Sequence, residues 1–557
     1  MDDQLPSPSP HAITQKNSRS KRILLWIAGI FLFLLACGFI AVEVALHRAE
    51  PILRARVIET LSTRFDSRVE LEHFHVYFLH GFEVTGSGLK LYPNQIEPNQ
   101  MRDKPLFAVD EFSFRTTWHG LLHTPMYVDK VNLKGMQIHM PPKDQRQNMP
   151  KLNTNNGGGG KIEILVGEIE IENAALVLET SKPGKIPIDF EISHLTLESV
   201  GQNQPMKFHA ILTNPKPVGD IDSTGYFGPF DTHSPGDSPV RGDYTFSHAD
   251  LNTIKGIGGM LSSTGKYDGT LNHIVVDGET DTPNFSIDSG NHPMPLHTKF
   301  HAIVDGTNGD TYLQPVDAQL LHSHILAVGD VVRAPDGGHN ITLDVTVAPA
   351  RIEDMLSLAV KTVPPIMTGD LKLKTKFFLP PGKASVSQKL QLKGNFQIVN
   401  ATFSNQKVQA GVDQLSLRGQ GKPEEAKELD KQHPETIQSQ MDGQFELGGS
   451  KLTFSSLNYN VPGADIALNG VYTLDGSQFD FHGKARLKAK LSEMVGGWKS
   501  ILLMPVDPIF SKHGAGTEVP ISITGTRSDP QFGLDFGRKD KDKEDKDTAP
   551  SDDKNKH

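Results

Sequence analysis

Hydrophobic and polar residues alternate along most of the chain from about residue 69 onward. Clear examples are Ile341–Val347 (ITLDVTV), Leu371–Phe377 (LKLKTKF) and Phe479–Phe481 (FDF). A period of two places the apolar side chains on one face of a β-strand and the polar side chains on the other. Runs of such strands, separated by turns rich in glycine and proline, are typical of antiparallel sheets with one face in water. The pattern therefore predicts a mainly β protein with few short helices.

The pattern near the N-terminus is different. Ile23–Val42 (ILLWIAGIFLFLLACGFIAV) is a run of twenty residues without a charge, and at about 1.5 Å per residue it matches the thickness of one hydrocarbon core. Basic residues precede it, so the positive-inside rule predicts a cytoplasmic segment at 1–22, a transmembrane helix at 23–46 and export of the rest. A cleaved signal peptide is the alternative. Because the apolar run is long and continues into VEVALHR, an uncleaved anchor is favoured.

The remaining chain divides into four segments. Residues 47–140 form an N-terminal β region, which begins with apolar residues at helical spacing in Ala49–Ser62, a short amphipathic helix. Residues 141–160 (PPKDQRQNMPKLNTNNGGGG) have no periodicity and are predicted to be a flexible linker and a domain boundary. Residues 161–537 continue the strand pattern as a repetitive region. Residues 538–557 carry mixed charge without apolar residues and are predicted to be disordered.

Three segments of the repetitive region resemble one another. Each has an isoleucine four residues before a glycine and, about twenty residues later, Ala-x-Leu or Ala-x-Ile at the predicted start of a short helical turn. The three matches are Ile221/Gly225 with Ala249–Leu251, Ile325/Gly329 with Ala350–Ile352, and Ile466/Gly470 with Ala489–Leu491. The same ending on glycine occurs at 131–135, 390–394 and 521–525. The glycine is an even number of residues from the apolar positions, so it points to the apolar face of the strand. There it either relieves crowding where the sheet curves or marks the end of the strand.

Composition and charge exclude several classes of protein. The chain has 557 residues and a net charge of -10, and no basic patch interleaved with aromatic residues, which argues against a nucleic-acid partner. The single cysteine, Cys37, lies inside the predicted anchor. The exported part therefore has no disulfide and no cysteine ligand for a metal.

The sequence offers no candidate for catalysis. His513–Thr517 (HGAGT) resembles a phosphate-binding loop, but it lacks the lysine and precedes a predicted strand instead of a helix. His73/His75 and His322/His324 have the spacing of metal ligands on a strand, yet no acidic neighbour is evident in the sequence, which favours solvated or weakly paired histidines. Serine-hydrolase and zinc-protease motifs are missing. We expect no enzymatic activity, no catalytic residues, no cofactor and no metal.

The most informative feature is the large number of predicted strands that have one apolar and one polar face. An apolar face must be covered by helices, by a second sheet or by a ligand, and the predicted helices are too few. This leaves a folded-over sandwich or a curved sheet that encloses an apolar groove. A groove beside a membrane favours acyl chains, because each buried CH₂ contributes about 0.8 kcal/mol. The candidate groove residues are Ile341, Leu343, Val345, Ile466, Leu468, Tyr472, Val519, Ile521 and Ile523.

Several segments, taken in order, resemble the AsmA-like family of bacterial envelope proteins. They are the apolar anchor followed by AEPILRARVIETLSTRFDSRVEL (49–71), VNLKGMQI (131–138), YNVPGADIALNGVY (459–472), LSEMVGGWKSILL (491–503) and VPISITGTRSDP (519–530). The last three fall in residues 440–537, which correspond to the C-terminal region of that family.

The resemblance implies a single-pass protein of the bacterial inner membrane, with a cytoplasmic N-terminus and its bulk in the periplasm. It also implies an elongated, twisted, repetitive β-groove related to bridge-like lipid transfer proteins, with a role in outer-membrane lipid homeostasis and assembly. The expected partners are the inner membrane, a phospholipid or another acyl-chain lipid, and envelope proteins. The alternative is a non-enzymatic anchored scaffold for the assembly of outer-membrane proteins, in which the apolar faces would be closed in a sandwich.

Overall fold

In the computed structural model the protein is mainly β, with 64% of the described residues in strands, a large twisted sheet and few helices. The structure describes residues 50–534 except for 64, 78–80, 94–103, 123–124, 142–163, 180–186, 202–203, 232–233, 291, 336, 362, 429–435, 491, 495–515 and 527–528. The chain forms two compact units, residues 1–188 and 189–557. The predicted transmembrane helix (23–46) and charged tail (538–557) lie outside the described residues. Within the described part, no helix combines the length and the apolar character needed to cross a bilayer.

The N-terminal unit is a sheet built around the long strand β3. One edge of β3 pairs with both β1 and β2, and its other edge pairs with β4. β4 pairs with β5 and β6, and β7 runs parallel to β5 and β6. The elements are β1 (Ser67–Glu70), β2 (His73–Tyr77), β3 (Phe82–Pro93), β4 (Phe107–Thr116), α2 (Trp118–Leu122), β5 (Met126–Lys134), β6 (Gln137–Met140) and β7 (Ile164–Leu178).

Two sequence predictions concern this unit. Residues 50–63 are helical, as expected for Ala49–Ser62, and Val57 and Ile58 of this helix pack on buried residues of β2 and β3. The predicted linker 141–160 falls between β6 and β7, so the unit includes a strand on each side of it. Residues 142–160 themselves lie outside the described part.

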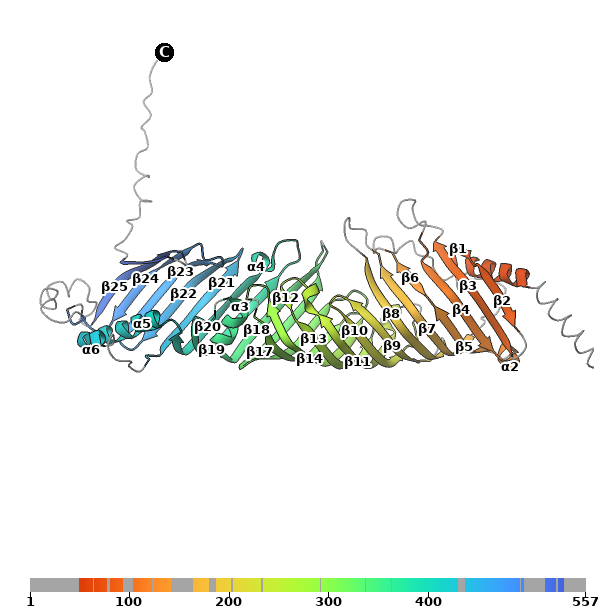
Figure 1. Cartoon of the computed structure of the whole chain (residues 1–557), viewed down its shortest axis with the longest axis horizontal. Coiled ribbons are helices and arrows are strands. Elements are labelled where there is room, and N and C mark those ends of the chain that lie inside the picture. Colours follow the sequence, from red (N-terminus) through yellow and green to blue (C-terminus); the bar gives the residue numbers. More distant parts are fainter. Residues whose placement is uncertain are drawn as a thin grey trace, which may run out of the picture. The chain divides into compact units, whose positions relative to one another are not determined.

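The C-terminal unit is a succession of antiparallel strands, each paired with the next in the chain (Figure 1). The exception is the short β12, which pairs with β14, while β11 pairs directly with β13. The strands are β8 (Ile188–Val200), β9 (Met206–Pro215), β10 (Val218–Phe227), β11 (Pro239–Asp250), β12 (Ile257–Gly258), β13 (Met260–Thr270), β14 (His273–Ile287), β15 (Met294–Val304), β16 (Thr311–Leu320), β17 (Ser323–Arg333), β18 (His339–Arg351), β19 (Met367–Leu379), β20 (Gln391–Phe403), β21 (Ser439–Gly448), β22 (Lys451–Val461), β23 (Ala464–Thr473), β24 (Phe479–Leu487), β25 (Thr517–Gly525) and β26 (Pro530–Leu534). The three strands named in the sequence analysis lie within β18, β19 and β24.

Short helices interrupt this order at the turns. They are η2 (Pro235–Asp237), η3 (Leu251–Thr253), α3 (Ile352–Ala359), α4 (Val386–Lys389), α5 (Gln406–Gly419) and α6 (Pro423–Glu428). Two of the three predicted helical turns coincide with η3 and α3, each of which begins two residues after a buried alanine, Ala249 or Ala350. At the third, Ala489 is buried and residues 492–494 form a turn.

The repeated glycines lie inside strands where the sheet bends. A Cβ added to Gly470 of β23 would lie 2.3 Å from the carbonyl oxygen of Asp480 on the neighbouring strand, and one added to Gly225 of β10 would lie 2.1 Å from that of Arg241. The neighbouring backbone thus occupies the space of a side chain, which requires the sheet to bend toward the face on which these glycines lie. Curvature is therefore the role of the two glycines. Gly525 differs, because it ends β25 with a φ of +106°.

Candidate binding face

The nine predicted groove residues lie on one face of the C-terminal sheet. Directly opposite residues of antiparallel strands point to the same side, and the register can be followed from strand to strand. Leu343 of β18 is opposite Phe377 of β19, and Phe377 is opposite Leu392 of β20. Further along the sheet, Leu468 is opposite Gly483, which is opposite Ile521. We call the side of this sheet that carries the nine residues the apolar face.

A row of phenylalanines crosses the apolar face between β20 and β24. The ring centroids are 6.3 Å apart for Phe396 and Phe445, 6.3 Å for Phe396 and Phe454, and 5.8 Å for Phe454 and Phe481. Some of these rings lie over glycines. A Cβ on Gly470 would come within 2.8 Å of the Phe481 ring, so the missing side chain leaves room for an aromatic ring against the backbone.

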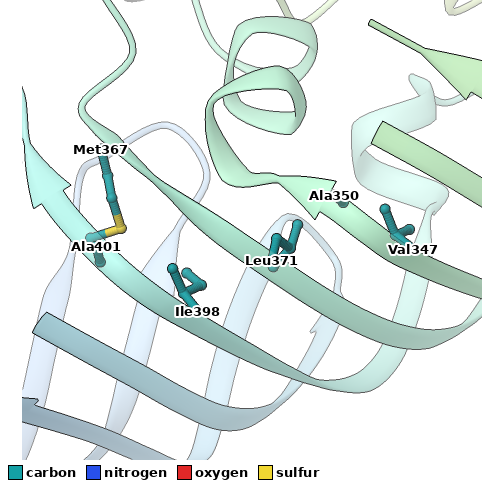
Figure 2. Packing of buried hydrophobic residues seen from close by; sticks show 6 residues of the cluster. All are labelled: Val347, Ala350, Met367, Leu371, Ile398 and Ala401. Atoms are coloured by element: carbon teal, nitrogen blue, oxygen red, sulfur yellow. The ribbon is translucent and has the colours of Figure 1, made fainter. Parts of the chain in front are cut away.

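Helices cover the apolar face at one end of the strands. Six buried residues of β18, β19 and β20 form a cluster there (Figure 2): Val347, Ala350, Met367, Leu371, Ile398 and Ala401. Ile352, Met355 and Leu356 of α3 pack on this cluster, and Val345 lies at its margin. α5 covers the corresponding ends of later strands through Val412, which packs with Val461, Ala464 and Leu487.

Toward the other end of the strands, the described apolar side chains are only partly buried. Ile341, Leu343, Leu468, Ile521 and Ile523 are each half-buried. The strands follow one another in a single sheet (Figure 1), and the most extensive backbone contacts between strands are those of hydrogen-bonded neighbours. Since no second sheet lies on the apolar face among the described residues, a curved sheet is favoured over a folded-over sandwich.

Contacts of α3 indicate that the sheet curves toward the apolar face. α3 follows β18 directly, yet its backbone also contacts β14, and the Ser357 carbonyl lies 3.0 Å from His292 Nδ1 beside β15. In a flat sheet, β14 and β18 would be about 19 Å apart, whereas an eight-residue helix is about 12 Å long. Contact of α3 with both β18 and β14 favours a concave apolar face at this position.

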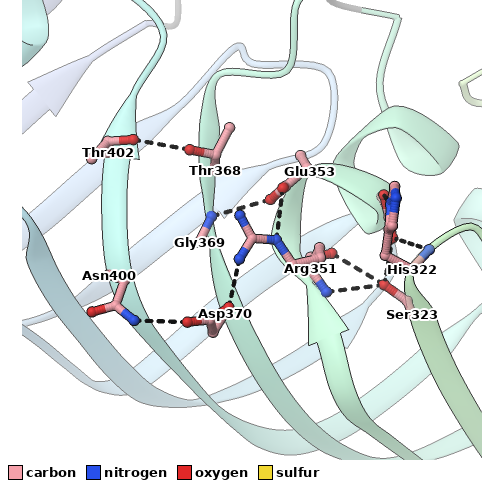
Figure 3. A network of polar contacts seen from close by, with 10 residues as sticks. His322, Ser323, Arg351, Glu353, Thr368, Gly369, Asp370, Asn400 and Thr402 are labelled. Atoms are coloured by element: carbon pink, nitrogen blue, oxygen red, sulfur yellow. Dashed lines mark hydrogen bonds and ion pairs between the residues drawn. The ribbon is translucent and has the colours of Figure 1, made fainter.

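A polar network holds α3 against the strand ends (Figure 3). The buried Asp354 accepts hydrogen bonds from Ser323 Oγ at 2.8 Å and from the His322 backbone N–H at 3.0 Å. Arg351 donates to Asp370 at 2.5 Å, and the Asn400 amide donates to the same carboxylate at 2.7 Å. The Asn400 amide and the Arg351 guanidinium hold the pKa of Asp370 below its ordinary value.

The opposite face of the sheet is polar and carries cross-strand histidine–aspartate pairs. They are His209–Asp222 at 2.9 Å, His297–Asp281 at 2.9 Å, His301–Asp277 at 2.7 Å and His324–Asp317 at 2.7 Å. Three of the four histidines singled out in the sequence have an acidic neighbour that the sequence did not predict. His324 pairs with Asp317, His322 lies 3.6 Å from Asp354, and His75 lies 3.5 Å from Glu50.

These acidic partners come from other strands and helices, so the sequence around each histidine could not reveal them. Among the described residues, no group of three or more histidine, cysteine, aspartate or glutamate side chains is arranged to hold a metal ion.

The glycine-rich segment 513–517 leads into a strand, as expected. Thr517 begins β25, and Val519, Ile521 and Ile523 lie within it, with Ile521 opposite Leu534 of β26. Residues 513–515 lie outside the described part.

Comparison of the chain with protein-family models, with curated proteins and with solved structures finds no match.

Proposed function

We propose that this protein binds acyl-chain lipids along the apolar face and so contributes, as an anchored periplasmic protein of the bacterial inner membrane, to lipid transfer and outer-membrane homeostasis. The observation that carries the proposal is the concave face of half-buried apolar side chains, which α3 and α5 cover at one end of the strands in the described part of the chain. The predicted anchor at 23–46 and the resemblance to AsmA-like proteins support the location and the class of ligand.

Lipid chains fit this face energetically. The phenylalanine row and the aliphatic residues of β18, β23 and β25 place apolar side chains along this face, most of them half-buried. Burial of a sixteen-carbon chain at about 0.8 kcal/mol per CH₂ contributes of the order of 10 kcal/mol before the cost of ordering. The alternative, an assembly scaffold with closed sandwiches, is less well supported, because no second sheet covers the apolar face among the described residues.

The test is the lipid content of the full-length protein, exchanged from detergent into an amphipathic polymer and measured by native mass spectrometry. We expect phospholipid to co-purify with the wild type and to fall several-fold in Leu468→Asp and Ile521→Asp, because each places a carboxylate on the apolar face. The matched control is Ala467→Asp, which places the same charge on the exposed, polar side of β23. Wild type without lipid, or equal lipid in all four proteins, would show the proposal to be wrong.

A further inference from the structure

The apolar face changes character between β10 and β15. Six hydroxyl side chains come together there, flanked by apolar neighbours such as Ile221 and Phe300. They are Ser223, Tyr244, Ser263, Tyr267, Thr280 and Thr298. The register connects them to the predicted groove, since Thr298 is opposite Ala318, which is opposite Ile325 in β17. We call these six residues the hydroxyl patch.

Glycines position the two tyrosines of the hydroxyl patch. A Cβ on Gly242 would lie 2.7 Å from the Tyr267 hydroxyl oxygen, and a Cβ on Gly265 or on Gly278 would lie 2.9 Å from that of Tyr244. The tyrosines therefore lie close over strands that lack side chains at these positions, with ring centroids 6.5 Å apart. Both rings are half-buried, so each keeps a surface that a bound molecule can reach.

The hydrogen bonds of the serines determine what the tyrosine oxygens can offer. Each hydroxyl has one hydrogen to donate and two lone pairs. Ser223 donates to the Asp243 carbonyl at 3.0 Å, so in its 2.8 Å contact with the Tyr267 hydroxyl it accepts. Ser263 donates to the Glu279 carbonyl at 3.0 Å and likewise accepts from Tyr244 at 3.2 Å.

Both tyrosine hydrogens are thus used within the protein. Burial raises the pKa of Tyr244 and of Tyr267, so both phenols stay protonated at neutral pH and keep these hydrogen bonds. The hydroxyl oxygens of Tyr244 and Tyr267 can therefore still accept a hydrogen bond from a bound molecule, but they cannot donate one.

We propose that Tyr244 and Tyr267 of the hydroxyl patch select, among the lipids bound by the apolar face, those with an O–H or N–H group next to the acyl chain. This inference rests on the proposed function and adds the class of lipid. The ester carbonyls of a diacyl lipid are acceptors only and cannot pair with the tyrosine oxygens. A hydroxyl or amide N–H placed there forms a hydrogen bond in a partly buried, apolar setting, where an unpaired polar group is costly.

The test compares hexadecanol with methyl hexadecyl ether, which has the same chain without the donor. The full-length protein, delipidated and held in an amphipathic polymer, is titrated with each probe, and one-to-one complexes are measured by native mass spectrometry. We expect the wild type to prefer hexadecanol by roughly three- to tenfold. In Tyr244→Phe/Tyr267→Phe the preference should fall to about one while ether binding is kept, because both rings remain.

The control is Tyr226→Phe, which removes a hydroxyl from the polar side of β10, where Arg241 stacks on the ring. It should keep the preference of the wild type. Equal binding of the two probes by the wild type overturns the inference but leaves the proposed function standing, and this comparison needs no variant. Failure of both probes to bind overturns the inference and the proposed function together.

Discussion

Single residues set the curvature of the sheet, and the sequence indicated them only in part. Parity placed Gly470 on the apolar face but could not separate curvature from strand termination. Which of the two roles Gly470 has depends on the backbone of the neighbouring strand, here the Asp480 carbonyl. The local sequence does not show which strand that is. The same limit applies to the phenylalanine row and to the tyrosines of the hydroxyl patch, whose partners lie across the sheet.

Replacement of Gly470 by alanine should destabilise the C-terminal unit by about 1–3 kcal/mol, because the added Cβ meets backbone that cannot move without flattening the sheet. The free energy of unfolding is measured by urea denaturation followed by circular dichroism. Gly448→Ala is the matched control, since nothing lies within 4 Å of the added Cβ. An equal effect of the two substitutions would contradict the steric account.

Single helices cover part of the apolar face, and here the sequence was less informative. The alanine motif predicted a helical turn at Ile352, but not its packing on β18, β19 and β20. α5 was not predicted as an individual element. Its local signal is Asn405, whose side chain accepts hydrogen bonds from the Lys407 and Val408 backbone N–H groups at the start of the helix.

Asp354→Ala should loosen α3 and cost about 1–3 kcal/mol, because the Ser323 hydroxyl and the His322 N–H lose their buried acceptor. We expect a lower free energy of unfolding together with increased binding of a hydrophobic dye. Glu424→Ala is the control. It removes a surface carboxylate on α6 that forms an exposed ion pair with Lys427, and should change stability by at most about 0.5 kcal/mol. Identical behaviour of the two variants would argue against the anchoring role of Asp354.

The pairing of the end of β18 with β19, next to α3, should also depend on pH. Because the folded-state pKa of Asp370 lies below its ordinary value of 3.8, the charged carboxylate stabilises the fold at neutral pH, and this contribution is lost as the pH falls through the folded-state pKa. Asp370→Asn should therefore be less stable than the wild type at about pH 6, and the gap should narrow at about pH 2.5. Urea midpoints at the two pH values measure this, and a constant gap would show that the pair with Arg351 contributes nothing.

At the scale of the whole molecule, alternation and turn chemistry were sufficient to predict a mainly β, repetitive protein. They did not give the two units or the parallel pairing of β7, because these depend on which strands meet after the segment 142–163. Within the C-terminal unit, backbone contacts are mostly between neighbouring strands. Stability in such an arrangement is a sum of local terms, as in solenoid proteins.

Phe481→Ala tests this locality. The loss of its contact with Phe454 should raise amide hydrogen exchange in β22–β25 and leave β9–β11 unchanged. Peptide-resolved mass spectrometry of the full-length protein measures both regions. Increased exchange spread evenly over the unit would indicate that it opens as one cooperative body.

The chain-order pairing of the C-terminal strands has a consequence for how this protein can diversify. A two-strand hairpin inserted at any turn would lengthen the sheet by about 10 Å and leave every later residue on its present side. One residue inserted within a strand, if no bulge absorbs it, would exchange the two sides for the rest of that strand. The length of the sheet can thus vary in steps of one hairpin, while the alternation of apolar and polar residues along each strand is kept. Homologues should therefore differ in length by whole hairpins.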